Sequence, residues 1–345
     1  MKKREVNYDL LRILAAFMVV FLHVAASKWE FLKPNDNRWI IMNIYDCFVR
    51  SAVPLFFMIS GAFMLKKETN FKKLYTKILS LTIIYFVWSC LYAIDTIGIY
   101  NLKNITIIDF LKTVLLSKYH LWFIPPLIGL YILQPVLYAI VHFEDGKYIK
   151  YLLTIFFFSG ILIPTVLQFV NNNIISSLLT KIPVELMGYS NYMILGYYLY
   201  NKKEFKFKPR LFVVGFVLTV LISIVICQFD ALRTGVPSSI LYGYFMLPVF
   251  IEAILLFIMF KKLIISSKVS KKLGKVTQYL STLTLGIYLF HPFILEHLDT
   301  VLKFNTLSFN PIFSVPIITM IVIVCCLLVS AIMIKIPIIR KLWIL

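Results

Sequence analysis

The sequence predicts an all-α integral membrane protein, a single bundle of about ten transmembrane helices with both termini in the cytoplasm. Hydrophobic residues make up 60% of the 345 residues and charged residues only 15%, whereas a soluble domain carries about 25% charged residues. The apolar residues form repeated runs of about 20, the length that crosses a bilayer as a helix. Because lipid cannot hydrogen-bond an open backbone, such runs predict helices; a β-barrel would show short alternating segments instead.

Ten apolar runs are the predicted spans. The first, residues 7–27, resembles a signal peptide, but its length and the Arg and His within it favour a retained first helix. The loops are short, so we expect one domain over residues 1–345 with no separate soluble domain, and we find no internal repeat. The other predicted spans are residues 39–65, 74–99, 121–141, 150–170, 183–200, 210–228, 237–260, 279–297 and 311–336.

The distribution of Lys and Arg predicts the orientation. With the N-terminus in the cytoplasm, the inner segments hold 24 of these residues and the outer loops hold 9. Cationic loops stay on the cytoplasmic side, so an even number of spans with both ends inside is favoured. The clearest inner markers are the loops 66–77, 201–210 and 261–275. The net charge of +19 therefore reflects topology and contact with anionic membrane lipids, and we expect no nucleic-acid partner.

Two basic residues lie deep inside the first span, where a charged side chain is costly and therefore a functional candidate. They are Arg12 and His23, eleven positions apart. Eleven residues of α-helix return to within roughly 20° of the start, so the two side chains share one face about 16 Å apart along the axis. That face is predicted to point into the bundle, with Arg12 in the inner half of the membrane and His23 in the outer half.

The second span carries a candidate ion pair followed by residues that disturb a regular helix. Asp46 and Arg50 are spaced i and i+4, in the order that favours pairing within one helix. Pro54 leaves a backbone carbonyl free, and Ser60-Gly61 allows another helix to approach closely. Arg50 lies toward the outer side of this span.

Two more histidines are predicted at the depth of His23. The fourth span begins with His120 and Trp122 before a double proline, an irregular beginning that is tolerated where it lines a cavity, and the ninth carries His291. Two acidic residues also lie within spans, Glu185 in the sixth and Glu252 in the eighth. A buried glutamic acid can simply be protonated and hydrogen-bonded, so both functional and structural roles stay open for them.

The cysteines give no sign of a metal site or a disulfide framework. All five lie inside apolar runs without metal-ligand spacing, so we interpret them as small hydrophobic residues of the bundle and expect neither zinc nor disulfides. They are Cys47, Cys90, Cys227, Cys325 and Cys326.

Four motifs in order along the chain resemble those of the membrane-bound acyltransferase-3 family. They are the Arg12/His23 pair, the stretch 50–61, the run His120-Leu-Trp-Phe, and the stretch 286–291 that reads Gly-Ile-Tyr-Leu-Phe-His. Together they cover nearly the whole chain. The resemblance implies a ten-helix O-acyltransferase of the plasma membrane that takes an acyl group, usually acetyl, from cytoplasmic acyl-CoA. It also implies a cell-envelope polysaccharide or lipid-linked glycan as acceptor.

Combined with side-chain chemistry, the resemblance gives the candidate residues predicted roles. His23 would take the proton of the acceptor hydroxyl, because a histidine is largely neutral at pH 7. Arg50, His120 and Trp122 would donate hydrogen bonds to the developing oxyanion. The predicted catalytic residues are His23, Arg50, His120, Trp122 and His291.

The predicted donor site lies nearer the cytoplasm. A guanidinium binds phosphates bidentately, so Arg12 is assigned to acetyl-CoA. The full set of predicted donor-binding residues is Arg12, Ser60, Glu185 and Tyr192. Glu252 has no counterpart in the family pattern, and its role stays open.

Three alternatives stay open on the sequence. The acyl group could pass directly to the acceptor or rest first on His23. A transporter or flippase for a glycan precursor could use the same buried polar residues as a path, although the absence of a repeat disfavours it. A regulatory domain of the same fold would bind the donor without turnover. The oligomeric state and the acceptor hydroxyl are not predicted.

Overall fold

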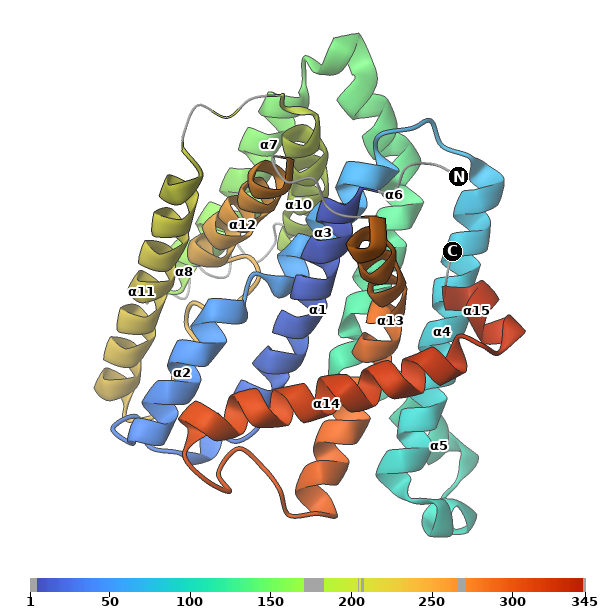
Figure 1. The fold of residues 1–345 in the computed structure, drawn as a ribbon, viewed down its shortest axis with the longest axis vertical. Helices are drawn as coiled ribbons and strands as arrows, with labels where there is room; N and C mark the ends of the chain where they lie inside the picture. Colours follow the sequence, from blue (N-terminus) through green and yellow to red (C-terminus); the bar gives the residue numbers. More distant parts are fainter. Residues whose placement is uncertain (1–4, 171–182, 204, 206–207, 266–270, 344–345) are drawn as a thin grey trace.

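The computed structural model describes residues 5–170, 183–203, 205, 208–265 and 271–343, and these residues form helices and no strand (Figure 1). Most long helices run side by side along the long axis of the molecule, and α14 crosses the others obliquely. The α-helices are α1 (Val6–Ala26), α2 (Asn37–Val49), α3 (Ala52–Met64), α4 (Phe71–Ile97), α5 (Ile107–Leu116), α6 (Ile124–His142), α7 (Ile149–Phe157), α8 (Ile163–Leu167), α10 (Val184–Asn201), α11 (Pro209–Thr234), α12 (Leu247–Ile265), α13 (Lys271–Thr300), α14 (Pro311–Met333) and α15 (Pro337–Trp343).

Shorter elements join several of these helices. A π-helical turn links α7 to α8, so these three elements form one continuous helical stretch. The 3₁₀ segments are η1 (Trp29–Phe31), η2 (Ile99–Asn104), η3 (Tyr119–Phe123) and η4 (Phe143–Gly146), and the π-helical turn is η5 (Phe158–Leu162).

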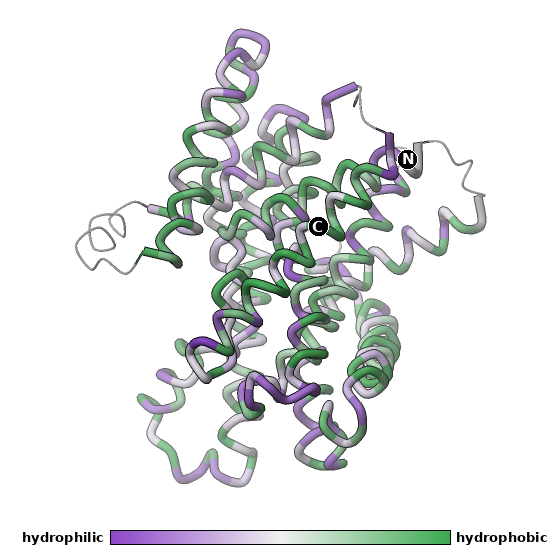
Figure 2. The backbone as a smooth tube through the Cα atoms, turned by 90° about the vertical axis from the view of Figure 1, so that its left-hand side faces the viewer, coloured by the Kyte–Doolittle hydropathy of each residue, from purple (hydrophilic) through white to green (hydrophobic). Residues whose placement is uncertain are grey.

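The helices have the length and composition of membrane spans. Among the described residues, seven helical stretches are long and apolar enough to cross a bilayer. Figure 2 shows hydrophobic residues along most of the helix lengths, with hydrophilic residues concentrated near the two ends of the bundle. All ten predicted spans contain helix, and α10, α12 and α13 account for the three that are not among the seven. The exact number of crossings and the cytoplasmic location of the termini stay predictions.

The first helix is an integral part of the bundle. α1 packs against α2, α3, α12, α13 and α14, and its buried residues extend from Tyr8 to Ala25. This central position explains how the side chains of Asp9, Arg12 and His23 avoid lipid.

The span predicted at 39–65 matches one helical stretch, Asn37–Met64, in which a turn at Arg50 and Ser51 separates α2 from α3, because Pro54 has no N–H to donate to the carbonyl of Arg50. Several other predicted boundaries were wrong. The span predicted at 237–260 begins only at Leu247, since residues 235–246 follow a non-helical course. α13 starts eight residues before its predicted limit, and α5 forms where only a loop was expected. Thr106 caps α5, its hydroxyl accepting a hydrogen bond from the backbone N–H of Asp109.

Glycines bring α3 and α10 into backbone contact. A Cβ added at Gly61 would lie 1.8 Å from the carbonyl oxygen of Met193, and one added at Gly196 would lie 2.0 Å from that of Met58. Each helix therefore places a glycine against the backbone of the other. The close approach predicted for Ser60-Gly61 is confirmed, and it fixes the wall of the bundle from which Ser60 projects.

Candidate functional site

Three histidines from distant parts of the chain form a cluster in the bundle. His23 comes from α1, His120 from η3 and His291 from α13. The rings of His23 and His291 are stacked with centroids 5.0 Å apart, and those of His120 and His291 meet edge to face at 5.4 Å. His120 and His291 are buried, whereas His23 is half-buried. The cluster that the sequence predicted from helix depth is thus present.

The hydrogen bonds of His291 settle which of its nitrogens can accept a proton. Nδ1 lies 3.1 Å from the carbonyl oxygen of Ile287 and 2.8 Å from that of Tyr288. Carbonyls only accept, so Nδ1 carries the hydrogen and Nε2 keeps its lone pair. Nε2 of His291 and both ring nitrogens of His120 are buried without a hydrogen-bond partner among the described residues. Such orphaned groups need an explanation, and a bound substrate or water would supply it.

Aromatic residues hold His120 in place. Tyr288 donates a hydrogen bond of 2.7 Å to the carbonyl of His120, and the ring of Tyr92 lies edge-on to the imidazole at 5.0 Å. Tyr92 is itself anchored by a 2.7 Å hydrogen bond to the carbonyl of Leu289. Tyr288, Leu289 and His291 lie within four residues of α13. This helix therefore carries His291 and also supplies the contacts that position His120.

His23 and His120 line a cavity that we call the histidine chamber, and the ring of His291 contacts both of them from outside its lining. The chamber encloses about 140 Å³. Most of its lining is apolar, and its polar lining comes from His23, His120, Trp122, Tyr244, Thr284 and Tyr288. The indole of Trp122 is stacked on the ring of Tyr244 at 5.2 Å, which fixes one wall. The chamber is therefore largely apolar, with titratable groups gathered in it.

A second cavity, the arginine pocket, lies nearer the N-terminal end of α1 and encloses about 260 Å³. Arg12 donates a 3.2 Å hydrogen bond to Ser281 Oγ, which in turn donates one of 2.8 Å to the buried carboxylate of Asp9. Asp9 also pairs with Arg12 at 3.5 Å. The lining residues are Arg12, Ile59, Ser60, Phe63, Met64, Lys77, Tyr131, Ser281, Thr282, Thr284, Leu285 and Trp343.

Both cavities are bordered by the same turn of α13. Thr284 and Leu285 line both of them. Arg12 lines the pocket at one end and His23 lines the chamber at the other, and these residues share one face of α1 about 16 Å apart along the helix. Both side chains therefore border a cavity inside the bundle, as the predicted common inward face requires.

Arg50 lies beside the chamber, close enough to His23 for its charge to act on that ring. Its guanidinium forms the predicted ion pair with Asp46, four residues earlier. One face of the guanidinium covers the ring of Tyr242, 4.1 Å from the centroid. Nε of Arg50 is buried and has no hydrogen-bond partner among the described residues, so the pair leaves one N–H for a bound group.

A comparison with known families identifies the domain to which these cavities belong. The model of a family described as an acyltransferase domain matches residues 5–331. The chain belongs to the acyltransferase-3 family. No curated protein and no solved structure matches it significantly. The match covers nearly the whole chain, and with its apolar helices the protein is a multi-pass membrane acyltransferase.

The structure brings most of the predicted site residues of this acyltransferase together, but not all. Arg12 and Ser60 line the arginine pocket, as expected for donor-binding residues. Tyr192 is fully buried in the core, where its hydroxyl donates a 2.5 Å hydrogen bond to the carbonyl of Tyr244. Glu185 is exposed in the first turn of α10. Neither Tyr192 nor Glu185 lines either cavity.

The remaining acidic candidate is also away from the two cavities of the acyltransferase. Glu252 is buried in α12, and its Oε2 has no hydrogen-bond partner among the described residues. It lies near enough to Arg50 to feel the charge of the guanidinium. In the part of the chain that is described, no three His, Cys, Asp or Glu side chains are grouped as a metal site.

Several residues around the site were missed on the sequence. Asp9 stands three positions before Arg12, a spacing that favours pairing on a helix, so a signal for it was present. Tyr288 lies within the recognised motif before His291. Ser281 and Tyr244 had no such signal, since only the fold brings them to Arg12 and Trp122.

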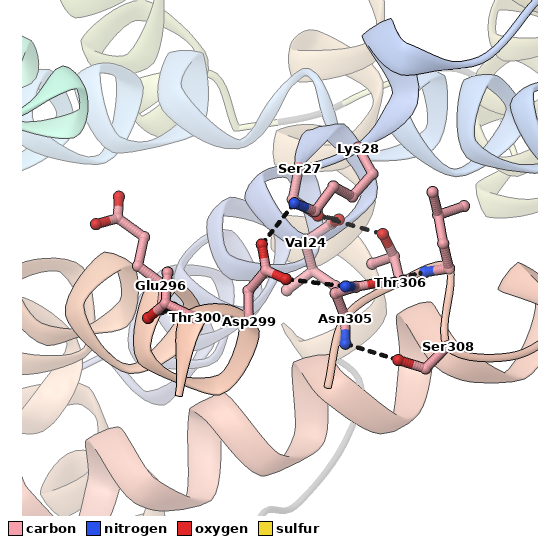
Figure 3. Close-up of polar contacts among 10 residues, drawn as sticks. Val24, Ser27, Lys28, Glu296, Asp299, Thr300, Asn305, Thr306 and Ser308 are labelled. Atoms are coloured by element: carbon pink, nitrogen blue, oxygen red, sulfur yellow. Dashed lines mark hydrogen bonds and ion pairs between the residues drawn. The ribbon is translucent and has the colours of Figure 1, made fainter. Parts of the chain in front are cut away.

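A network of polar contacts closes the end of the acyltransferase beyond His23 (Figure 3). Lys28, just after α1, forms a 2.5 Å ion pair with Asp299 near the end of α13, and Asn305 donates a 2.9 Å hydrogen bond to the same carboxylate. Ser27 lies 3.3 Å from the hydroxyl of Thr306. Burial raises the pKa of Asp299, but the hydrogen bonds from Lys28 and Asn305 outweigh it and hold that pKa below its ordinary value. The network ties together the helices that carry His23 and His291.

Proposed function

We propose that this acyltransferase transfers an acetyl group from cytoplasmic acetyl-CoA to a hydroxyl of a cell-envelope polysaccharide or lipid-linked glycan, in the plasma membrane. The observation that carries the proposal is the pair of neighbouring cavities that share Thr284 and Leu285, one lined by cations and hydroxyls and the other by His23 and His120. An extended donor with an anionic head and an uncharged thioester end matches this distribution.

In the proposed reaction, the donor lies with its phosphates at Arg12 and Lys77 and its thioester in the histidine chamber. A guanidinium and an ammonium both bind phosphates, the former with two parallel hydrogen bonds. The hydroxyls of Ser60 and Thr282 supply further hydrogen bonds in the same pocket. The largely aliphatic lining of the chamber suits an uncharged acyl group.

The chemistry balances without another reactant. His23 takes the proton of the acceptor hydroxyl as its oxygen forms a bond to the thioester carbon. The resulting oxyanion accepts hydrogen bonds from donors such as the Trp122 indole N–H and the Arg50 guanidinium. Collapse of this intermediate breaks the carbon–sulfur bond, and the protonated histidine returns the proton to the thiolate. The products are the O-acetylated acceptor and CoA thiol.

The choice of acceptor rests on sequence resemblance. The run Tyr119-His-Leu-Trp-Phe123 resembles that of the O-acetyltransferase of enterobacterial common antigen, a member of the family with a glycan acceptor. Since no curated protein matches significantly, this closer likeness stays a prediction. Mass spectrometry of envelope glycans from a deletion strain should reveal the loss of O-acetyl groups from one glycan, and unchanged acetylation of every glycan would reject the acceptor class.

One experiment separates the enzyme from the transporter alternative. Purified protein reconstituted in lipid with a membrane extract as acceptor should release CoA thiol from acetyl-CoA, and the His23→Gln variant should not. A flippase would instead move a glycan precursor across the vesicle without thiol release. Donor binding without turnover in every acceptor preparation would favour the regulatory alternative.

A further inference from the structure

The short helix at the C-terminal end of the described chain reaches the arginine pocket. α15 follows α14 after a turn and packs beside α4 (Figure 1). Its last residue, Trp343, lines the pocket together with Arg12, Lys77 and Ser60. α15 lies beyond residues 5–331, the part that the family model matches.

The indole of Trp343 has a seat shaped by the sequence. A Cβ added at Gly286 would lie 2.8 Å from Cζ3 of Trp343 and 2.1 Å from Oγ of Ser330. A side chain at position 286 would therefore displace the indole or the serine. On its other side, Trp343 packs with Leu342 against an apolar cluster that includes Leu289, and its ring lies 6.5 Å from that of Phe290.

This seat puts the indole in the arginine pocket, beside the turn of α13 that borders both cavities. Gly286 directly follows Thr284 and Leu285, the residues that line both the pocket and the chamber. A donor that extends from Arg12 toward His23 has to pass this turn of α13. The part of acyl-CoA between its phosphates and its thioester is the pantetheine arm, whose methylene and dimethyl groups suit contact with an indole.

We propose that Trp343 on α15 forms a wall of the donor site and binds the pantetheine arm of the acyl-CoA. The inference rests on the proposed use of acyl-CoA and adds a donor-binding residue that lies beyond residues 5–331, the part matched by the family model. The indole contacts the pantetheine arm between the phosphates, which bind at Arg12, and the thioester, which lies in the histidine chamber. Loss of the indole weakens donor binding but leaves the residues of the histidine chamber unchanged, because Trp343 does not line that cavity.

The first test measures binding of radiolabelled acetyl-CoA to purified protein in lipid nanodiscs. Trp343→Ala should raise the dissociation constant about tenfold, and Trp343→Phe, which keeps an aromatic ring, should stay within about threefold of the original protein. Ile338→Ala is the matched control, because Ile338 lies on the same helix, is 74% exposed and lines neither cavity. Equal affinity of all four proteins would overturn the inference while leaving the proposed function intact.

The second test does not depend on a stable alanine variant. Trp343→Cys should react with a maleimide, and acetyl-CoA or CoA should slow this alkylation at least about fivefold, while adenosine 3′,5′-bisphosphate, which lacks the pantetheine arm, should not. Protection by the bisphosphate alone would assign the indole to the nucleotide and reject the pantetheine contact. If acetyl-CoA binds the original protein but does not protect the cysteine, the inference fails alone. If acetyl-CoA does not bind the original protein, the proposed function fails with it.

Discussion

Replacement of His23 tests the chemistry most directly. His23→Gln keeps a polar side chain of similar length but cannot take a proton at neutral pH, and His23→Ala removes the ring. A positioned general base is worth about 10²–10⁴ in rate, or about 2.7–5.4 kcal/mol of barrier. Both variants should lose this much turnover, because the ring that lines the chamber is lost while Arg12 and its pocket are untouched.

The assay is acetylation of the acceptor glycan, normalised to folded protein in the membrane, beside a measurement of acetyl-CoA binding. Donor affinity should stay within about threefold of the original protein, less than the 1.4 kcal/mol of a tenfold change. His297→Gln is the control, since His297 is half exposed near the end of α13 and outside the cluster. It should keep normal activity.

Near-normal acetylation by His23→Gln would refute the assignment of the base to His23. The stacked ring of His291 would then be the next candidate, because its Nε2 is free to accept a proton. If the variant loses both turnover and donor binding, His23 has a structural role instead, because its ring also packs against Tyr119 at 5.2 Å.

Four further outcomes follow from the geometry. Arg12→Ala should weaken acetyl-CoA binding about tenfold, the worth of a charge-assisted hydrogen bond, as measured by equilibrium binding; unchanged affinity in a folded variant would refute the donor role. Gly61→Ala should cost about 1–3 kcal/mol or more by overpacking against α10, seen as a lower Tm, and an unchanged Tm would contradict the backbone contact. The pKa of Asp299 is lower in the folded protein than in the unfolded chain, so its stabilisation is present above the unfolded value and lost as the pH falls through the folded value; the Tm difference between the original protein and Asp299→Asn should therefore shrink below about pH 4, and a difference independent of pH would argue against this pair. Reporters fused after Gly235 and after Gly274 should appear on opposite sides of the membrane, outside and inside, and a common side would refute the predicted topology.

Helices were predictable because membrane spans follow from apolar length alone, whereas their breaks depend on single residues. Pro54 was recognised as a disturbance, yet the break at Arg50 that follows from it was not placed. The start of α12 at Leu247 was missed, since the irregular segment before it is apolar enough to resemble a span. α5 was missed because ten residues are too short for a span.

Features of the site that depend on one helix were predictable from the sequence. Contacts between residues of two or more elements were not. The common face of Arg12 and His23 follows from helical periodicity. The contacts of Ser281 with Asp9, and of Trp122 with Tyr244, join residues far apart in the chain, and no pattern within one element encodes them. Trp343 is of the same kind, because its seat exists only once Gly286 and α15 are packed together.

The paired glycines of α3 and α10 restrict how a bulky donor can enter. With Gly61 against the carbonyl of Met193 and Gly196 against that of Met58, neither helix can slide or rotate without driving one backbone into the other. The side of the arginine pocket formed by α3 is therefore held rigidly in place. If acyl-CoA is the donor, as proposed, a widening of this pocket that admits the nucleotide comes from other elements that line it, α4, α6, α13 and α15, through side chains that change rotamer. The packing of the C-terminal helix would then be coupled to donor binding.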